Sequence, residues 1–534
     1  MKILIVDALA ANEGRRKFSR DTIGVGPRLL AGICDKNSIF SKIVRVEDLL
    51  EKEVLSISDF NHFLISAMSV DKIAVNRVIK LIRKKNNSAF ILLGGPIASN
   101  KTELEGYDID IAVIGEGERI LNELILNNFS IDNLSSEINI IKREGKINLI
   151  LKKEVKQKEI FKEFYPSTSH ITDYPDYWYS KVYVEIVRGC SNHYRGEIVR
   201  NEGGCSDCGN CDSPDSVLTD ECPENIPPGC GFCSVPATFG PPRSKPIELI
   251  VDEVQSLFEN GVRRVILSAP GFLDYYRNPE NEEIFSPTKP SANIEKISEL
   301  LTNLANVRDN QKHKCSISIE NIKPSLVTPK TAEIIGKFLP NTSISIGCET
   351  FDEKHSDQIG RPPSPKKALE AAKLFMKNNI HPQIYLIHSL PGETVQTLEK
   401  TKDVVMNQLK DYAEKITVYK YLPLPNSPFT MTNTPFPVDR HLQKVKREEL
   451  KKSIINFNLE KKHSLVDTYI TSIVAEKDRT REKTYICYPL YSGPAISVKT
   501  EKDILGKLVK ILIIGVVSDK LVSGKIVKII ENIV

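Results

Sequence analysis

Two long stretches of the chain alternate short apolar runs with segments that carry apolar residues at helical spacing. In residues 1 to about 130, the apolar runs predict strands at 2–9, 41–46, 62–70, 89–96 and 110–118. Between them, segments such as AVNRVIKLIRKKN have the periodicity of amphipathic helices. Strands that are apolar on both faces and alternate with helices predict a parallel sheet with helices on both sides.

The second stretch runs from Val182 to about Pro428 and has the same alternation. Its apolar runs predict six strands, which read VYVEIV, RRVILSAP, KCSISIE, TSISIGCET, PQIYLIHSLPGET and KITVYKYLP. Helical patterns such as NIEKISELLTNLA and PKKALEAAKLFMKNN lie between them. We therefore expect six βα units, with functional residues at the carboxyl ends of the strands.

Three further segments complete the domain organisation. Residues 131–181 end in an aromatic, proline-containing stretch that predicts an ordered strap between domains. Residues 437–484 form a basic helical segment, which either covers a domain edge or contacts an acidic partner. Residues 485–534 combine short strands with turn glycines and predict a small β-barrel related to oligonucleotide-binding barrels. The predicted fold class is thus α/β with a small all-β tail.

The composition is that of a globular protein with several domains. Of the 534 residues, 40% are hydrophobic and 27% are charged, and the net charge is only +4. This mild charge argues against nucleic-acid binding driven by bulk electrostatics, although a local basic patch stays open. The amino terminus lacks signal-peptide features and no apolar run could span a bilayer, so we expect a cytoplasmic protein without a membrane partner.

The cysteines are unevenly distributed. Seven of the eleven lie between Cys190 and Cys233, and close CxxC pairs in a large chain favour metal or cluster binding over a disulfide framework. The other four stand alone and are expected to be buried small hydrophobic residues: Cys34, Cys315, Cys348 and Cys487.

Four of the clustered cysteines fall within an insert at residues 191–229. They are Cys205, Cys208 and Cys211 in CSDCGNC, and Cys222 before a proline. The run is similar to ferredoxin cluster motifs, and four such thiolates also satisfy a tetrahedral zinc site. A mononuclear structural metal such as zinc is favoured, because the short insert is rich in Asp, Gly and Pro and needs something other than a core to fold it. An iron–sulfur site and a metal-free disordered loop are the alternatives.

The other three clustered cysteines lie in two motifs at the ends of this insert. The sequence reads VYVEIVRGC at Cys190 and PPGCGFCSVP at Cys230 and Cys233. These motifs resemble the loop of radical S-adenosylmethionine (SAM) enzymes, in which three cysteines hold a [4Fe–4S] cluster and SAM completes the fourth iron. The usual C-x3-C-x2-C spacing is absent, because almost forty residues separate the first two cysteines. A triad within CSDCGNC is rejected, because the family places its first cysteine directly after the first barrel strand.

The resemblance extends along the second stretch and implies a partial (β/α)6 barrel over residues 182–436. By resemblance, Phe232 lies near the SAM adenine, and Ser268 to Pro270 replaces the glycine-rich turn that holds the SAM amino group. Glu349 is expected to reach the ribose. The motifs that recur in the family's order are IGCET with Gly347 and Glu349, QIGRPPS with Arg361, and LPGET at residues 390–394.

Small and acidic residues follow the strands of the first stretch. The motifs are SAMS with Ser66 and Ser69, GGP with Gly94 and Gly95, and GEGE with Glu116 and Glu118. Ligands of parallel α/β sheets bind at this edge, and glycine lets a bulky ligand approach the backbone. One interpretation is a Rossmann-like domain whose loops merely turn. The motifs also resemble the cobalamin-binding domain ahead of many radical SAM barrels, here residues 1–130. The missing DxHxxG motif suggests that no histidine of this domain ligates cobalt.

Together the motifs resemble cobalamin-dependent radical SAM methyltransferases with a TRAM-like tail at 485–534. In this family a 5′-deoxyadenosyl radical removes hydrogen from an unactivated sp3 carbon, and methylcobalamin then supplies the methyl group. The domain order resembles archaeal proteins that modify methyl-coenzyme M reductase, including its glutamine C-methyltransferase. The expected partners are a protein substrate and an electron donor such as ferredoxin or flavodoxin, while the TRAM-like tail leaves nucleic acid open.

Three alternative functions follow from the same sequence. A methylthiotransferase acting on tRNA or protein shares the barrel and tail, but it needs three amino-terminal cysteines and residues 1–180 hold only Cys34. A cobalamin-dependent radical SAM enzyme that does not transfer methyl groups fits the same motifs. A non-enzymatic metal-binding scaffold explains the cysteines, but not Glu349, Arg361 and LPGET in the family's order.

Overall fold

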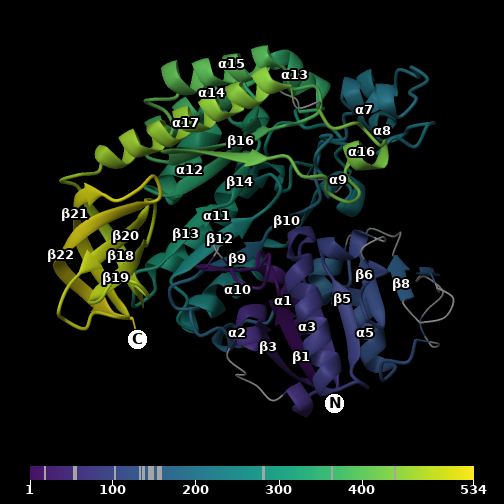
Figure 1. Cartoon of the computed structure of the whole chain (residues 1–534), viewed down its shortest axis with the longest axis horizontal. Coiled ribbons are helices and arrows are strands. Elements are labelled where there is room, and N and C mark those ends of the chain that lie inside the picture. The colour runs from purple at the N-terminus through teal and green to yellow at the C-terminus, as the bar shows by residue number, and fades with distance from the viewer. Residues whose placement is uncertain are drawn as a thin grey trace. The chain divides into compact units, whose positions relative to one another are not determined.

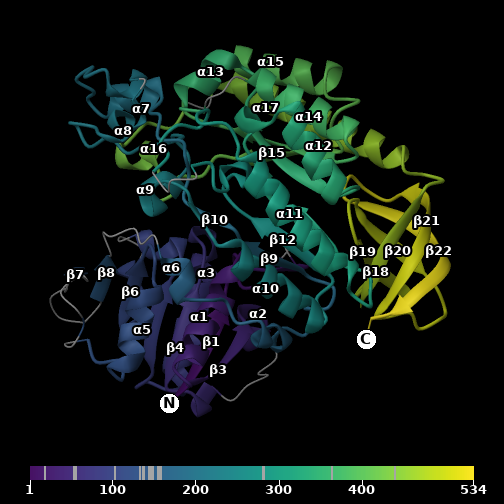
Figure 2. The ribbon, with the colours of Figure 1, turned by 180° about the vertical axis from the view of Figure 1, so that it is seen from behind.

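The computed structural model covers most of the chain and divides it into two compact units. The described residues are 1–16, 20–51, 57–100, 104–131, 134, 139–141, 149–152, 159–213, 215–278, 283–361, 365–437 and 440–533. Unit 1 comprises Met1–Val184 and Lys245–Asn260, and unit 2 comprises Glu185–Ser244 and Gly261–Val534. Figures 1 and 2 show the elements from opposite sides.

Unit 1 is built on a sheet that has, among the described residues, seven strands in the order β3-β1-β4-β5-β6-β8-β7. Their bounds are β1 (Lys2–Asp7), β3 (Phe40–Arg45), β4 (His62–Ser66), β5 (Phe90–Gly94), β6 (Ile111–Ile114), β7 (Asn139–Ile141) and β8 (Leu149–Lys152). Neighbours are parallel except the antiparallel pair β7 and β8. The parallel sheet predicted for residues 1–130 is confirmed.

Helices cover both faces of this sheet. They are α1 (Val25–Lys36), α2 (Val46–Glu51), α3 (Lys72–Lys85), α5 (Glu118–Leu126), α6 (Ile160–Glu163) and α10 (Ile247–Glu259). Helix α3 packs Val75 and Val78 onto alternate strand residues such as Val6, Ile65 and Leu93, while α1 and α5 lie together on the other face (Figures 1 and 2). The chain passes from β1 to β3 on one side and then to β4 on the other, so the strand order reverses between β1 and β4. Sheets of this kind bind ligands beside such a reversal, at the carboxyl ends of the strands.

The aromatic segment before residue 181 packs against strands β1 and β3 within unit 1. Tyr174 is buried, and its hydroxyl donates a hydrogen bond to the Asp7 carboxylate at 3.0 Å. Arg45 and Asp176 form a buried ion pair at 2.5 Å. The short strand β2 (Thr22–Ile23) pairs with the start of β9 (Lys181–Glu185). These tyrosine and aspartate contacts make the segment part of the packed domain.

The strands of unit 2 are β10 (Val187–Arg188), β11 (Arg243–Ser244), β12 (Arg264–Ser268), β13 (Ser316–Ile319), β14 (Asn321–Ile322), β15 (Ser343–Glu349), β16 (His381–His388) and β17 (Lys415–Lys420). The six strands expected after Val182 are β9, β12, β13, β15, β16 and β17, whereas the short strands β10, β11 and β14 were not expected. Strands β12 and β13 pair in parallel, as do β14 to β17 in sequence order. The Ser345 amide donates to the Glu320 carbonyl at 3.1 Å and joins the two groups. Their carboxyl ends therefore share one edge.

The helices of unit 2 follow its strands as the βα pattern predicts. They are α7 (Glu197–Glu202), α8 (Ser216–Asp220), α9 (Val235–Phe239), α11 (Ile294–Asp309), α12 (Pro329–Phe338), α13 (Glu353–Gln358), α14 (Pro365–Lys377), α15 (Val395–Asn407), α16 (Pro428–Met431) and α17 (His441–His463). The basic helix α17 covers the edge of β17, where the Asn458 amide accepts from Ile416 N and donates to Ile416 O. Of the two interpretations of this segment, the helix that covers a domain edge agrees with the structure.

The C-terminal segment forms a closed barrel that has five strands among the described residues, in the order β18-β19-β20-β22-β21. Their bounds are β18 (Tyr469–Lys477), β19 (Thr484–Pro489), β20 (Ala495–Lys499), β21 (Lys507–Val516) and β22 (Leu521–Asn532). The small β-barrel is confirmed, but it begins at Tyr469 rather than at residue 485. Strand β18 follows the basic helix after a short turn that contains no glycine, which hid the boundary in the sequence.

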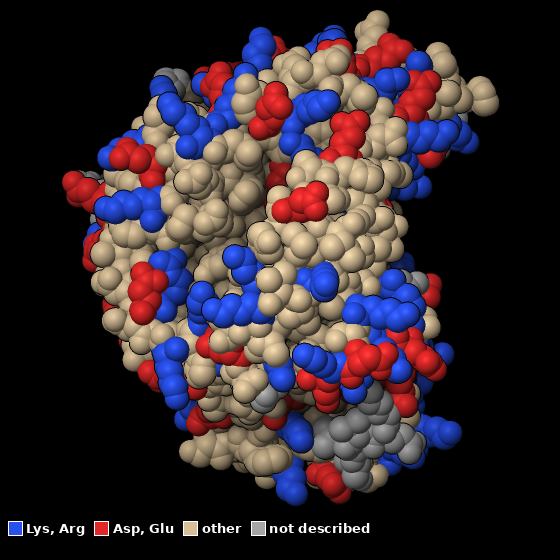
Figure 3. All heavy atoms as spheres, turned by 90° about the vertical axis from the view of Figure 1, so that its left-hand side faces the viewer, with Lys and Arg blue, Asp and Glu red and all other residues tan. Residues whose placement is uncertain are grey.

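Helix hydrophobicity and the distribution of charged residues are two further properties of this fold. Within the described residues, no helix is both long and apolar enough to cross a membrane. On the face in Figure 3, lysines and arginines are interspersed with acidic residues and neutral surface. The net charge of +4 is therefore not gathered into one field on that face.

Candidate functional site

A single residue, Asn192, contacts both Cys190 and Cys230, through its backbone and its side chain respectively. The Asn192 backbone N–H donates to Cys190 Sγ at 3.4 Å, and the Asn192 side-chain amide donates to Cys230 Sγ at 3.1 Å. The same amide also donates to the Gly360 carbonyl at 3.0 Å. Asn192 therefore holds two of the predicted ligands and the loop after α13 in one fixed arrangement.

Backbone hydrogen bonds fix the chain at both ends of the insert. Cys190 N donates to the Gly240 carbonyl at 2.9 Å, and Gly231 N donates to the Ile359 carbonyl at 2.9 Å. Gly189 has a φ of +89°, and a Cβ there would lie 2.2 Å from the Pro241 carbonyl oxygen. Only glycine fits this close approach in a left-handed conformation, which explains the RGC motif in local terms.

Burial raises the pKa of two of the predicted cluster cysteines, Cys230 and Cys233. The Cys190 and Cys230 side chains are buried. Burial raises the pKa of the Cys230 thiol, although Arg361 opposes the shift, and burial raises the pKa of Cys233 to about 12. Buried thiols of this kind lose their protons only when a metal ion supplies the compensating positive charge.

Glu349, at the end of β15, and Arg361, in the loop after α13, lie near the cysteines. Arg361 Nη1 lies 3.9 Å from Cys230 Sγ, and its Nη2 donates to the Gly347 carbonyl at 2.8 Å. Nη2 also lies 3.6 Å from a Glu349 carboxylate oxygen. A Cβ at Gly347 would meet that guanidinium at 2.6 Å. Glycine at this position therefore leaves room for the arginine beside the thiols.

Backbone strain marks the same edge. Glu349 ends β15 beyond a bulge and has a φ of +68°, while Ser389, directly after β16, has a φ of +64°. Residues other than glycine seldom adopt this left-handed conformation, and it recurs at functional sites where surrounding structure enforces it. Burial also raises the pKa of the Glu349 carboxyl, against the opposing charge of Arg361.

Ser268 meets a carboxylate that the sequence patterns did not single out. Its hydroxyl donates to Glu320 Oε2 at 2.6 Å, at the end of β12. Burial raises the pKa of Glu320, and hydrogen bonding from Ser268 only partly offsets it. Within the described residues no cation pairs with Glu320. A desolvated carboxylate at the strand ends is therefore open to a cationic ligand group.

Phe232 and the LPGET motif make packing and ion-pair contacts near this edge. Phe232 packs against a cluster that contains Leu390 and Phe429. Glu393 of LPGET turns back, accepts a hydrogen bond from Ser389 N at 2.8 Å, and pairs with Arg447 of α17 at 2.6 Å. These contacts explain the motif as a strand-to-helix turn that is locked by a buried ion pair.

The four cysteines of the insert are arranged differently. Cys208 is exposed and Cys205, Cys211 and Cys222 are partly exposed. Among the described residues, no three His, Cys, Asp or Glu side chains are placed to ligate a single metal ion. The zinc or iron–sulfur site predicted at residues 205–222 therefore stays a prediction.

A buried arginine anchors this insert instead. The guanidinium of Arg195 donates to the carbonyls of Ile226 at 2.6 Å, Thr219 at 2.5 Å and Asp220 at 2.9 Å. His193 and Asp220 add a contact at 2.6 Å. These contacts join residues 193–195 to residues 219–226, so side chains other than the cysteines hold the two ends of the insert together.

The carboxyl edge of unit 1 carries the predicted serine and glycines. Ser66 ends β4 and is buried, with its Oγ about 3.1 Å from where a Cβ at Gly26 would lie. Gly94 ends β5, and a Cβ built there or at Gly115 would meet no atom within 4 Å. Gly95 has a φ of +91° and lies too close to the Ala67 carbonyl for a side chain. Open space above two glycines suits a flat ligand.

The other predicted residues of this edge are less central. Ser69 is partly exposed in a turn that Asp71 organises, since Asp71 accepts hydrogen bonds from the backbone amides of Ala10, Asn12 and Met68. Glu116 is partly exposed, and Glu118 is buried at the start of α5. The structure thus groups Ser66, Gly94 and Gly115 at strand ends and places the two glutamates at a helix start.

Comparison with known proteins places this fold in a family. The chain is 38% identical over 534 residues to protein MJ1620 of Methanocaldococcus jannaschii, covering 99% of each. It is 35% identical over 533 residues to protein MK0932 of Methanopyrus kandleri, covering 99% of this chain and 97% of that one. The chain belongs to the family of these two proteins. Residues 216–405 match the Radical SAM superfamily, so the chain carries a radical SAM domain.

A more distant relative is similar to about half of the chain. A tRNA-2-methylthio-N(6)-dimethylallyladenosine synthase of Sulfurihydrogenibium is 25% identical over 285 residues, which are 51% of this chain and 60% of that protein. This likeness reaches only part of each chain.

Two solved structures share the fold at low identity. The radical SAM methyltransferase TsrM from Kitasatospora setae is 13% identical, with a TM-score of 0.55 over 80% of this chain and 74% of that one. The cobalamin-dependent SAM radical enzyme OxsB is 13% identical, with a TM-score of 0.57 over 87% of this chain and 68% of that one. The α/β fold class is confirmed.

The residues of the radical SAM domain fit a [4Fe–4S] cluster and SAM. Cys190, Cys230 and Cys233 supply three thiols, and a cluster distributes its ligands over several irons rather than around one metal ion. Asn192 and Arg361 direct N–H groups at sulfur, which is the kind of contact that stabilises thiolate-bound clusters. Asn192 and Glu320 were not predicted as site residues from the sequence. The only sequence signals for a role at the site were that Asn192 lies two residues after the first cysteine and that Glu320 directly follows an apolar strand.

Proposed function

We propose that the protein is a cobalamin-dependent radical SAM methyltransferase that methylates an unactivated sp3 carbon of a protein side chain. The observation that carries the proposal is the meeting of Cys190 and Cys230 on Asn192, beside Arg361 and Glu349 at one strand edge. The match of residues 216–405 to the Radical SAM superfamily supports it.

In this proposal Cys190, Cys230 and Cys233 hold the cluster through three thiolates, which leaves one iron open for SAM. When bound, the cluster supplies the electron that cleaves SAM, whose nucleoside fragment then removes hydrogen from carbon. Asn192 fixes the distance between the first two thiolates. Arg361 places positive charge beside Cys230, which partly offsets the effect of burial on the pKa of that thiol.

The strand ends next to the cysteines would position SAM. Ser268 and Glu320 form a hydrogen-bonded pair whose carboxylate lacks a cation among the described residues, so we assign them to the SAM ammonium group. Glu349 is assigned to the ribose and Phe232 to the adenine. Gly347 keeps the backbone open at this point.

Unit 1 would hold cobalamin at the carboxyl edge of its parallel sheet. Bound cobalamin supplies a carrier for the methyl group. Ser66, Gly94 and Gly115 lie at this edge, and the space above the two glycines is open. The shared fold with OxsB and TsrM supports this assignment.

The proposed partners follow from the same chemistry. The substrate is a protein side chain, with a glutamine of methyl-coenzyme M reductase as the candidate, and the electron comes from a ferredoxin or flavodoxin. The tRNA-modifying alternative is disfavoured, because residues 1–180 contain only Cys34, which is buried in α1. An auxiliary cluster in that region would lack its ligands.

The test combines cofactor and product analysis. Protein reconstituted anaerobically with iron, sulfide and cobalamin is expected to retain corrinoid and to transfer a deuterated methyl group from labelled SAM to a peptide that contains the candidate glutamine. Cys190→Ala is the matched control, which keeps corrinoid but loses transfer. Absence of corrinoid after reconstitution contradicts the methyltransferase proposal, and a methylthio mass on tRNA would favour the alternative.

A further inference from the structure

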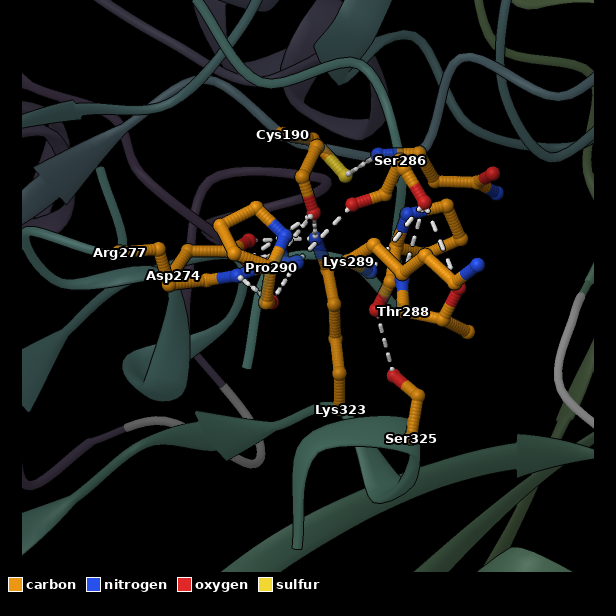
Figure 4. Close-up of polar contacts among 12 residues, drawn as sticks. Cys190, Asp274, Arg277, Ser286, Thr288, Lys289, Pro290, Lys323 and Ser325 are labelled. Atoms are coloured by element: carbon orange, nitrogen blue, oxygen red, sulfur yellow. Dashed lines mark hydrogen bonds and ion pairs between the residues drawn. The ribbon is translucent and has the colours of Figure 1, made fainter. Parts of the chain in front are cut away.

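A buried group of charged side chains lies directly beside Cys190. Asp274 ends the short helix η6 (Phe272–Asp274), and its carboxylate pairs with Arg277 at 2.6 Å and with Lys323 at 2.5 Å. Ser191 lies among them, since its hydroxyl is 2.7 Å from Lys323 Nζ and 2.9 Å from Asp274 Oδ1. Figure 4 shows Lys323 reaching up to this group, with Cys190 above its ammonium end.

This group holds one more positive than negative charge. Asp274, Arg277 and Lys323 are between 0% and 5% exposed. The remaining N–H groups of Arg277 donate to the carbonyls of Pro290 and Ser286, and among the described residues no second carboxylate contacts either cation. An excess buried charge is unfavourable unless an anion lies nearby.

Cys190, a ligand of the proposed cluster, directly precedes Ser191, which contacts both Lys323 and Asp274. Burial by itself lowers the pKa of Lys323, but Asp274 and then Cys190 outweigh it, and the pKa is raised. Arg361, on the Cys230 side, is different because Glu349 lies 3.6 Å from it. The uncompensated charge is thus on the Cys190 side of the predicted cluster.

Packing fixes the lysine in this place. Lys323 directly follows β14 (Asn321–Ile322), and its methylene groups lie so close to Gly271 that a Cβ there would meet them at 3.0 Å. Ser191, which Lys323 contacts, is the residue after Cys190. The ammonium group is therefore held at a defined position next to a predicted cluster ligand.

We infer that Asp274, Arg277 and Lys323 form a fixed cationic group that makes the cluster at Cys190 easier to reduce. The inference rests on the proposed function, which supplies the cluster. A one-electron reductant adds negative charge to a cluster already bound by three thiolates, and a nearby buried cation stabilises that added charge. Lys323 is therefore a positioning residue. Its charge changes the reduction potential of the cluster, and its contact with Ser191 holds the residue next to the Cys190 ligand in place.

The test is the midpoint potential of the cluster, measured by EPR during titration with dithionite in the full chain. Lys323→Met removes the excess charge, and we expect about a tenfold less favourable one-electron reduction, which is 59 mV more negative. Asp274→Asn adds excess charge and is expected to move the potential in the opposite direction. The double variant restores the net charge and should return toward the wild-type potential.

Controls separate tuning from general damage. Lys330→Met removes an exposed lysine that pairs with Glu333 at 3.1 Å, and it should leave the potential unchanged. Iron content confirms that each variant holds a cluster, and the double variant guards against a single variant that fails to fold. Clusters with equal potentials in the wild-type and variant proteins overturn this inference alone. A wild-type protein that binds no cluster overturns the proposed function as well.

Discussion

The two groups of cysteines between residues 190 and 233 differ in what holds them. Cys190 and Cys230 are buried and share Asn192, and Arg361 reaches Cys230 from the loop after α13. Cys208 in the insert is exposed. The first group is therefore placed by the folded scaffold, whereas the second depends on its own loop. The contrast shows that sequence spacing is a poor guide to which thiols form a site.

The scaffold explains how the long insert is tolerated. Arg195 closes its base through three carbonyl hydrogen bonds, so the chain between the cysteines forms a loop with fixed ends. The entropy of closing such a loop grows only slowly with its length. An insert of nearly forty residues can therefore separate Cys190 from Cys230 without moving them apart.

The largest expected effect is on SAM cleavage when a cysteine of the first group is lost. Cys230→Ala should reduce formation of 5′-deoxyadenosine to background, because the cluster loses a ligand and Asn192 loses its partner. Cys208→Ala is the matched control and should retain cleavage. The two variants are compared by chromatography of the nucleoside product under anaerobic reduction. Loss of cleavage in both to the same extent would remove the distinction between the groups.

The next effect concerns the base of the insert. Arg195→Ala leaves three buried carbonyls without their charged donor, and local opening of the insert should become easier by roughly 3 kcal/mol. Limited proteolysis and hydrogen exchange of residues 191–229 measure this change. Arg200→Ala is the control, since its pair with Asp212 is long at 3.6 Å and partly exposed, and such pairs contribute less than about 1 kcal/mol. Equal opening in both variants would contradict the anchoring role.

Removal of the bridging amide should weaken the cluster without removing a ligand. Asn192→Ala deletes the donor to Cys230 Sγ, and loss of such supporting contacts costs about 10–100-fold in metal affinity. The rate at which a chelator removes iron gives the measurement. Asn210→Ala, whose side chain donates to the Glu221 carbonyl in the insert, should release iron at the wild-type rate. A wild-type rate for Asn192→Ala would show that the triad does not need this bridge.

The smallest effect is on SAM affinity and its pH dependence. Glu320→Gln should weaken SAM binding about tenfold, because a hydrogen bond to a charged group contributes about 1.5–3 kcal/mol. Burial raises the pKa of Glu320, so the wild-type protein should lose affinity as the pH falls through that raised value, since the carboxylate then becomes neutral. The variant should lack this acid-side loss. Calorimetry across pH gives both results, and identical profiles would exclude Glu320 from the SAM site.

The sequence predicted the scaffold better than the site around it. Apolar runs located the strands of both parallel sheets, because strands buried on both faces leave an unambiguous pattern. The barrel boundary at Tyr469 was missed, since a strand that follows a charged helix without glycine gives no signal. Asn192 and Glu320 were missed for another reason: each acquires its role from a partner far along the chain.

The buried cations illustrate the same limit. Lys323 comes from a different segment than Asp274 and Arg277, and none of the three belongs to a spaced motif. Their importance follows from burial beside Cys190, which exists only in the folded chain. Motifs therefore predict the ligands, while the residues proposed to position and tune them can be recognised only in the folded structure.

The most direct test is EPR of the reduced cluster in a variant that has lost Cys205, Cys208 and Cys211 together. The account predicts that this variant keeps a [4Fe–4S] signal that changes when SAM is added, whereas Cys190→Ala shows no such signal. A SAM-sensitive cluster in Cys190→Ala, together with its loss in the triple variant, would place the radical site in the insert and contradict the account.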